Sequence, residues 1–201
     1  MTDVEQRVAG ILLAAGAGSR LGQPKALVEL AGETLAARGA RMLRDGGAEP
    51  VVLVTGAAPV ELPGVVAVHN PAWRTGMGSS LAAGLAAVPA GCAAAVVALA
   101  DQPLVGVAPV SRLIDAYQAG ATVAVATYDG KPRNPVLIAR EHWPEVAELA
   151  TGDRGARAFL RARPELVTSI ECGDVGSADD IDTPEDLARI AALDHGPQAS
   201  A

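Results

Sequence analysis

Aromatic residues are scarce in this sequence. Only 2% of the 201 residues are aromatic, although half are hydrophobic, so the core must be built from Ala, Val and Leu. That composition suits closely packed helices on a sheet, and the length fits one large domain. We therefore expect a single domain over residues 1–194, with residues 195–201 as a frayed tail.

Long hydrophobic runs are absent as well. No apolar run reaches the roughly 18 residues that a membrane-spanning helix needs. Residues 1–6 are polar rather than signal-like. These features predict a cytoplasmic protein with no membrane partner.

Positive charge is sparse and scattered, since the net charge is −7 and no basic run occurs. A protein that binds the nucleic-acid backbone needs clustered Lys and Arg, so the sequence predicts no nucleic-acid partner. The short local groups of Arg and Lys are typical instead of a site for a small anionic ligand.

Metal-binding spacings of Cys and His are also lacking. Cys92 and Cys172 are the only cysteines and form no CxxC pair, which predicts buried thiols rather than a disulfide or a metal site. The three histidines, at positions 69, 142 and 195, show no ligand spacing either.

Apolar, strand-like runs alternate with amphipathic helical stretches along the chain. Strands are predicted at residues 8–14, 51–55, 65–68, 93–100, 122–126, 136–139 and 167–171. Helices are predicted at residues 34–45, 79–88, 109–119, 140–149, 155–162 and 184–193. Because the strands are continuously apolar rather than alternating, the pattern predicts an α/β fold with a mainly parallel sheet covered on both faces.

Polar segments follow several of the predicted strands. They are LAAGAGSR (13–20), NPAWRTGMGSS (70–80), LADQP (99–103) and DIDTPED (180–186). In parallel α/β sheets, ligands bind beyond the carboxyl ends of the strands. We therefore expect these four segments, distant in sequence, to meet at one rim of the sheet.

The segment LAAGAGSRLGQPK (13–25) holds three glycines, Arg20 and Lys25 but no acidic residue. A P-loop requires Gly-Lys-Ser/Thr, whereas Lys25 follows Pro and precedes Ala. An ordinary strand-to-helix turn explains the glycines. It does not explain two cations without a nearby acidic partner.

A dinucleotide-binding G-x-G-x-x-G motif is a further interpretation of this segment. Gly16 and Gly18 fit it, but Leu21 takes the position of the third glycine. The strand predicted at 51–55 also ends without the acidic residue that would bind a ribose hydroxyl. Both departures disfavour a nicotinamide-dependent oxidoreductase.

The spacing L-A-A-G-x-G-x-R-x-G-x-x-K resembles the signature of the nucleotidyltransferase superfamily, which activates sugars, alcohols and cofactors with nucleoside triphosphates. The resemblance implies that the glycine-rich backbone wraps a triphosphate, which Arg20 and Lys25 neutralise as catalytic residues. Backbone N–H groups and fixed cations can stabilise the charge that moves to a leaving pyrophosphate. The nucleotide-binding residues that the match implies are Leu13, Ala14, Ala15, Gly16 and Gly18.

Five stretches resemble one branch of the superfamily, the molybdenum cofactor cytidylyltransferases and their relatives. They are NPAWRTGMGSSLAAGL (70–85), LADQP (99–103), GKPRNPVLI (130–138), GDRGARAFL (152–160) and DIDTPEDL (180–187). The cofactor substrate is inferred mainly from GMGSSL and GDRGAR. The resemblance implies a three-layer α/β/α sandwich of the nucleotide-diphospho-sugar transferase type, with one antiparallel strand in a Rossmann-like sheet.

Two aspartates are candidate metal ligands. Asp101 ends a predicted central strand and could cap the next turn, but the resemblance assigns it as a catalytic Mg²⁺ ligand. Asp182 could cap the last helix, although Thr183 lies nearer the helix start and suits that role better. Asp182 is therefore the second candidate ligand of the Mg²⁺, and Asp180 is the alternative.

The remaining candidate binding residues are Ser80 and four arginines. Ser80 follows two glycines before a helix; these residues could form a plain cap, but the resemblance places a serine hydroxyl at the nucleotide base. The resemblance also places four arginines around the second substrate, namely Arg74, Arg133, Arg154 and Arg157. Each of them could otherwise be a solvated surface residue, and Trp73 fits packing and stacking equally well.

The reaction implied by the resemblance moves CMP from CTP to the terminal phosphate of molybdenum cofactor (molybdopterin) and releases pyrophosphate. A phosphate nucleophile is already ionised, so no catalytic His is needed. A methyl group at Ala15, where guanylyltransferase relatives tend to carry Gly, favours CTP over GTP. Two alternatives stay open: transfer to a sugar phosphate or other phosphorylated small molecule, and a non-catalytic chaperone that passes the cofactor to a molybdoenzyme client.

Overall fold

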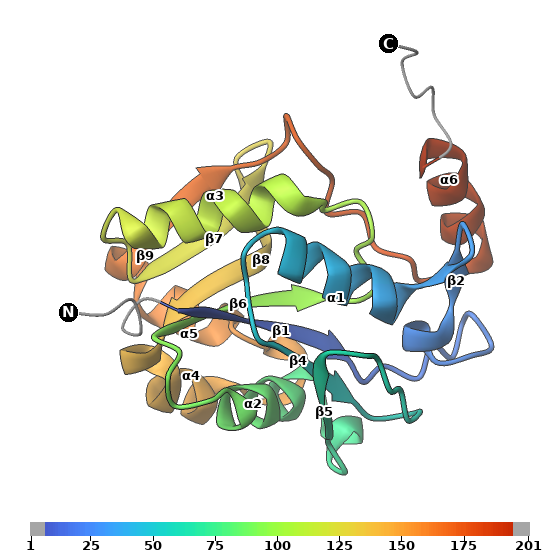
Figure 1. Cartoon of the computed structure of the whole chain (residues 1–201), viewed down its shortest axis with the longest axis horizontal. Helices are drawn as coiled ribbons and strands as arrows, with labels where there is room; N and C mark the ends of the chain where they lie inside the picture. Colours follow the sequence, from blue (N-terminus) through green and yellow to red (C-terminus); the bar gives the residue numbers. More distant parts are fainter. Residues whose placement is uncertain (1–6, 195–201) are drawn as a thin grey trace.

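A seven-stranded sheet forms the centre of the computed structural model, which describes residues 7–194 (Figure 1). In spatial order the strands are β5 (Val65–His69), β4 (Val51–Thr55), β1 (Val8–Ala14), β6 (Ala94–Leu99), β8 (Lys131–Ala139), β7 (Val123–Tyr128) and β9 (Val167–Glu171). β8 runs antiparallel to both neighbours, and the other pairs are parallel. The predicted α/β fold with one antiparallel strand is confirmed; the tail predicted at 195–201 lies outside the described residues.

Helices cover both faces of the sheet and make the predicted three-layer sandwich (Figure 1). α1 (Leu35–Asp45) and α3 (Val107–Gln118) pack on one face. α2 (Met77–Ala87), α4 (Trp143–Leu149) and α5 (Arg157–Ala162) pack on the other. No helix within residues 7–194 is long and apolar enough to cross a membrane.

The central strands are buried on both sides. All seven residues of β1 are buried, with Leu12 in the core under α1 and α3 and Ile11 in the core under α2. A strand covered on both faces has no polar side, which explains why its sequence is apolar without alternation. Cys92 and Cys172 are buried free thiols, as predicted.

A small unit lies at the carboxyl ends of the central strands. In it, α6 (Pro184–Asp194) packs against a two-stranded sheet of β2 (Glu29–Leu30) and β3 (Glu33–Thr34) (Figure 1). Its buried residues are Val28, Leu30, Leu35, Ile181 and Ile190. We call residues 25–35 with 181–194 the α6 unit. The sequence pattern missed β2 and β3 because strands of two residues carry no periodicity.

Several element boundaries differ from the predictions where polar residues or glycines interrupt the apolar pattern. β8 begins at Lys131 rather than at 136, because residues 131–133 are exposed and give no apolar signal. The helix predicted at 155–162 begins at Arg157, since Gly155 has a φ of +51°, which an α-helix excludes. α2 begins at Met77 rather than at 79, and the helix predicted at 140–149 is a 3₁₀ turn followed by α4.

Candidate active site

A cleft of about 560 Å³ opens at the carboxyl ends of β1 and β6. Its walls come from the end of β1, the start of α2, the end of β6 and the turn at Gly152–Arg154. The predicted nucleotide-binding residues that line the cleft are Leu13, Ala14, Ala15, Gly16 and Ser80. Lys25, Arg74 and Asp101 line it as well.

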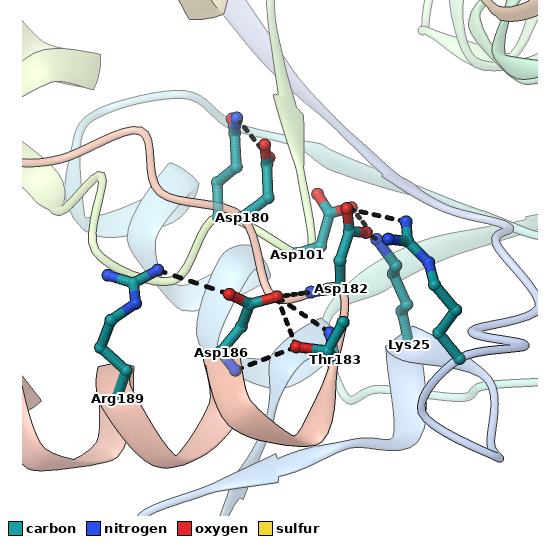
Figure 2. A network of polar contacts seen from close by, with 9 residues as sticks. Lys25, Asp101, Asp180, Asp182, Thr183, Asp186 and Arg189 are labelled. Atoms are coloured by element: carbon teal, nitrogen blue, oxygen red, sulfur yellow. Dashed lines mark hydrogen bonds and ion pairs between the residues drawn. The ribbon is translucent and has the colours of Figure 1, made fainter.

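Two cations and two carboxylates converge beside the cleft (Figure 2). Lys25 Nζ lies 2.6 Å from Asp101 Oδ2 and 2.5 Å from Asp182 Oδ1. Arg20 Nη2 lies 2.9 Å from Asp182 Oδ2. The two aspartates are 76 and 157 residues away from Lys25 in sequence. The acidic partners that the glycine-rich segment lacks locally are therefore supplied by distant parts of the chain.

Electrostatic attraction between the side chains of this cluster stabilises their charged forms. Burial disfavours the charged form of Lys25, but the carboxylates of Asp101 and Asp182 outweigh burial, so the pKa of Lys25 lies above its ordinary value. The hydrogen bond from Lys25, with further attraction from Arg20, lowers the pKa of Asp182. Lys25 is therefore a cation and Asp182 an anion at neutral pH.

Backbone geometry explains how the glycine-rich loop folds back on itself between Gly16 and Lys25. Gly18 and Gly22 have φ angles of +58° and +74°, which side chains disfavour. A Cβ atom at Gly18 would lie 2.0 Å from the carbonyl oxygen of Gln23. The N–H of Lys25 donates to the carbonyl of Gly16 at 3.3 Å and closes the loop. Gly18 thus shapes the loop, although it does not line the cleft.

The segment before α6 leaves Asp182 free of helix capping. The Thr183 hydroxyl accepts a hydrogen bond from the N–H of Asp186 at 3.2 Å, and Asp186 Oδ2 accepts one from the N–H of Thr183 at 3.0 Å (Figure 2). This capping box starts α6, as predicted for Thr183. The N–H of Ile181 donates to the carbonyl of Asp101 at 2.8 Å, which holds the two aspartate-bearing segments together.

Asp101 and Asp182 fit a divalent cation better than Asp180 does. Asp101 Oδ1 is buried and has no hydrogen-bond partner among residues 7–194. Carboxylate oxygens are hard ligands, and Mg²⁺ combines one or two of them with substrate phosphates. Asp180 instead accepts a hydrogen bond from Gln102 Nε2 at 2.8 Å, while burial and repulsion from Asp101 raise its pKa. Within the described chain, no group of three His, Cys, Asp or Glu side chains forms a metal site.

Close packing at the start of α2 explains its glycines. A Cβ atom at Gly76 would lie 2.3 Å from the carbonyl carbon of Gly152. A Cβ atom at Gly78 would lie 2.2 Å from the carbonyl oxygen of Ala150. The segments GMGSS and GDRG therefore fit against each other, and glycine is needed for this contact as well as for the turn.

Sequence reasoning missed three residues of the site: Asn70, Met77 and Asp153. Asn70 Nδ2 donates to Ser79 Oγ at 2.9 Å and to Ser80 Oγ at 3.0 Å, so it orients the hydroxyl in the cleft wall. Met77 and Asp153 line the cleft. For Asn70 a signal existed, because a polar residue directly follows β5 at the same rim.

The four predicted arginines divide between two places. Arg74 lines the cleft and stacks on Trp73, with its Cζ atom 4.4 Å from the ring centroid. Trp73 also lines the cleft, and its side chain packs against Gly56. The other three, Arg133, Arg154 and Arg157, line a smaller cavity of about 60 Å³ that shares Met77 with the cleft.

A mainly parallel sheet whose first strand leads into a glycine-rich cationic loop, with carboxylates that pair with the cations of that loop beside a cleft, defines an α/β protein of the nucleotidyltransferase type. The family described as MobA-like NTP transferase domain matches residues 10–167. The chain therefore belongs to the MobA-like NTP transferase family, within the nucleotidyltransferase superfamily, as the resemblance implied.

The curated proteins that are similar to this chain carry different names. The chain is 41% identical to the nicotine blue oxidoreductase of Paenarthrobacter nicotinovorans, over 91% of this chain and 96% of that protein. It is 29% identical to the purine catabolism protein PucB of Bacillus subtilis, over 90% and 94%. Over 23% of each chain, it is 55% identical to a protein of Opitutus terrae named "Probable molybdenum cofactor guanylyltransferase".

Solved structures share the whole fold. A Mycobacterium sp. strain JC1 homologue of Mycobacterium tuberculosis Rv0371c has a TM-score of 0.79 and 32% identity, covering 93% of this chain and 96% of that one. A complex of Rv0371c with manganese has a TM-score of 0.73 and 26% identity, covering 93% and 98%. The predicted fold of the nucleotide-diphospho-sugar transferase type is confirmed.

Proposed function

We propose that this chain transfers CMP from CTP to the terminal phosphate of molybdenum cofactor and releases pyrophosphate. The observation that carries the proposal is the convergence of Arg20 and Lys25 with Asp101 and Asp182 beside the cleft. Fixed charges of this kind suit a reaction in which negative charge moves onto a leaving pyrophosphate.

In this proposal, some residues of the chain bind the nucleotide and others neutralise the charge of its phosphates. The backbone at residues 13–16 and the Ser80 hydroxyl hold the base and the ribose. Lys25 and Arg20 exchange their carboxylate partners for the phosphates of the bound nucleotide. The acceptor phosphate is already ionised, so the protein has to position it in line with the α-phosphorus and needs no general base.

A divalent cation, proposed to be Mg²⁺, completes this site. Asp101 and Asp182 would hold it, and the buried, unpartnered Asp101 Oδ1 supports this assignment. Such a cation neutralises phosphate charge in nucleotidyl transfer. The manganese complex among the similar structures supports a divalent cation, and Mg²⁺ remains our choice from the ligand set.

The proposal also names one acceptor, molybdenum cofactor, and one nucleotide, CTP. The similarity, over 23% of the chain, to a protein named as a probable molybdenum cofactor guanylyltransferase supports the cofactor as acceptor. A molybdoenzyme client and a cytoplasmic location belong to the same proposal. The Ala15 side chain lines the cleft, and its methyl group narrows the space for a base, which favours CTP over GTP. Transfer to another phosphorylated small molecule is the alternative within the same chemistry.

An oxidoreductase is the second candidate function, because a relative 41% identical over almost the whole chain is named nicotine blue oxidoreductase. The same cleft would then hold a nicotinamide dinucleotide. The end of β4 argues against it, since Thr55 and Gly56 stand where a ribose-binding acid is expected.

A pyrophosphate-release assay with each nucleoside triphosphate, with and without molybdopterin-type cofactor, tests the proposal. We expect release that requires both CTP and the cofactor. Tight binding of the cofactor without release would favour the chaperone. Oxidation of NADPH in the presence of an oxidised dye, with no pyrophosphate from any triphosphate, would favour the oxidoreductase.

A further inference from the structure

Asn70 is a buried polar residue that directly follows β5 and reaches the start of α2 with its side chain. It is 4% exposed, and Ser80, which lines the cleft, is 3% exposed. Asn70 Nδ2 donates to both Ser79 Oγ and Ser80 Oγ. Because buried polar groups in folded proteins are hydrogen-bonded, these bonds decide where each hydroxyl can direct its own proton.

A backbone group fixes the orientation of the Asn70 amide. The N–H of Ala72 can only donate, and it lies 2.9 Å from Asn70 Oδ1. The oxygen of the amide therefore faces Ala72, and the nitrogen faces the two serines. An amide nitrogen donates and does not accept, so it occupies an acceptor position of each hydroxyl and leaves both hydroxyl protons to other partners.

The two hydroxyls differ in the partners of their protons. Ser79 Oγ donates to the backbone, where the carbonyl oxygen of Ala72 lies at 3.0 Å and that of Gly76 at 2.9 Å. Among residues 7–194, the Ser80 hydroxyl has no acceptor for its proton. Since Ser80 lines the cleft, its proton is available to a molecule that binds there.

The usual acceptor of a helical serine is already occupied. A serine inside a helix commonly donates to the carbonyl four residues before it. For Ser80 this carbonyl belongs to Gly76, and its oxygen accepts from Ser79 Oγ. The start of α2 and the amide of Asn70 thus leave the cleft as the direction for the Ser80 proton.

We propose that Asn70 is a positioning residue for base recognition, because it presents the Ser80 hydroxyl to the cleft as a donor and withholds it as an acceptor. The inference rests on the proposed function for the presence of a nucleotide base in the cleft. The ring nitrogen N3 of cytosine accepts a hydrogen bond. In uracil the same nitrogen carries a proton and would meet Ser80 as a second donor. Asn70 therefore selects between two bases of the same size.

Competition binding of CTP and UTP to the intact chain tests this inference, because the two nucleotides have the same sugar and phosphates. We expect CTP to bind at least about tenfold more tightly, since two facing donors leave buried polar groups unsatisfied. In Asn70→Asp, which has nearly the same shape, the carboxylate accepts from Ser80 and still accepts from Ala72, so the ratio should fall to one or below. Ser79→Ala is the matched control, because it removes the other hydroxyl bonded to Asn70 and should keep the ratio.

A second set of variants separates positioning from a merely structural role. Ser80→Ala removes the donor itself and should bring the ratio to near one. Adding Asn70→Asp to Ser80→Ala should change the ratio no further, because Asn70 acts through Ser80. Thermal melts report the fold of each variant. If Asn70→Asp does not fold, Asn70→Ala takes its place with the same expected fall, since the Ser80 hydroxyl can then rotate and present its oxygen.

Three results would overturn the inference. They are equal binding of CTP and UTP by the unmodified chain, an unchanged ratio in the Asn70 variant, and a further fall when that variant is combined with Ser80→Ala. Pyrophosphate release by the unmodified chain is measured separately. A CTP preference that depends on Asn70, without release from any triphosphate, overturns the proposed function and leaves the role of Asn70 standing. Release from CTP with an unchanged ratio in the Asn70 variant overturns the inference alone.

Discussion

The candidate site has two sides, which differ in the number of buried side chains that support them. The sheet side consists of residues 13–16, Ser80 and Asp101, at the ends of elements that fill the two large cores. The loop side consists of Arg20, Lys25 and Asp182, in the glycine-rich loop and the α6 unit. Five buried side chains form the core of that unit.

Exposure follows this division only for Arg20 and Asp182, whose side chains are 66% and 35% exposed. The side chain of Lys25, on the loop side, is 18% exposed, and that of Asp101, on the sheet side, is 20% exposed. Segments with few buried contacts open locally at a lower free energy than the core does. Under the proposed function, base recognition would depend on the rigid part of the molecule and phosphate binding on the part that can rearrange. The cation would take Asp101 from the first part and Asp182 from the second.

The largest expected effect comes from removing one carboxylate on each side. Asp101→Asn should remove metal-dependent turnover, because the rigid ligand is lost. Asp182→Asn should retain turnover at a raised Mg²⁺ requirement, since Asp101 still holds the cation. A Mg²⁺ titration of pyrophosphate release measures both variants. An unchanged requirement in both would mean that the two aspartates have structural roles and that the metal binds elsewhere.

Lys25→Ala removes the side-chain contact between the two sides and leaves the backbone hydrogen bond from Ile181 to Asp101. Lys25 touches both Asp101 and Asp182, and a lost preorganised charge donor costs roughly 10²–10³ in rate. We expect that loss in kcat with the fold retained, as read by circular dichroism. Turnover close to that of the unmodified chain, in a folded variant, would contradict a phosphate-binding role for this lysine.

Ile190→Ala tests whether the α6 unit opens by itself. Truncation of a buried Ile costs roughly 2–5 kcal/mol, and the small cluster should place this one near the lower end. Amide hydrogen exchange should accelerate in α6 and not in β1. The matched control is Leu193→Ala on the same helix, where the side chain is 58% exposed. Equal loss of protection in α6 and β1 would show that the two sides unfold as one unit.

Ala15→Gly should have the smallest effect, confined to the sheet side. Removal of one methyl group is worth about 0.8 kcal/mol, so we expect the preference for CTP over GTP to fall roughly fourfold. Competition binding of the two nucleotides measures the ratio. Tighter binding of GTP than of CTP by the unmodified chain would refute the base preference.

The positions of most sheet-side residues could be predicted from sequence, because they end or follow continuous apolar strands. The run at 8–14 predicted a strand, and residues 13–16 lie at its carboxyl rim. Asp101 follows β6 in the same way. These positions depend on local patterning and on a general property of parallel sheets, whereas the nucleotide-binding roles of residues 13–16 and Ser80 and the metal role of Asp101 were implied by the resemblance.

The loop side could be predicted only in part. Arg20 and Lys25 were recognised from spacing, yet their contact with Asp182 depends on the α6 unit, whose two-residue strands give no periodic signal. The position of Asn70 directly after β5 was a signal for the rim, but its role depends on two hydroxyls that it reaches only in the fold.

The reversed strand β8 has a consequence for how such a protein can diversify. Because β8 runs against β6, its first residues, including Arg133, reach the rim where parallel strands end. The tight turn between β7 and β8, at Asp129–Gly130, therefore lies at the same rim as the cleft. A hairpin of this kind can change in length while β1 and its glycine-rich loop stay unchanged. Under the proposed function, the nucleotide chemistry and the choice of acceptor would then depend on separate stretches of chain.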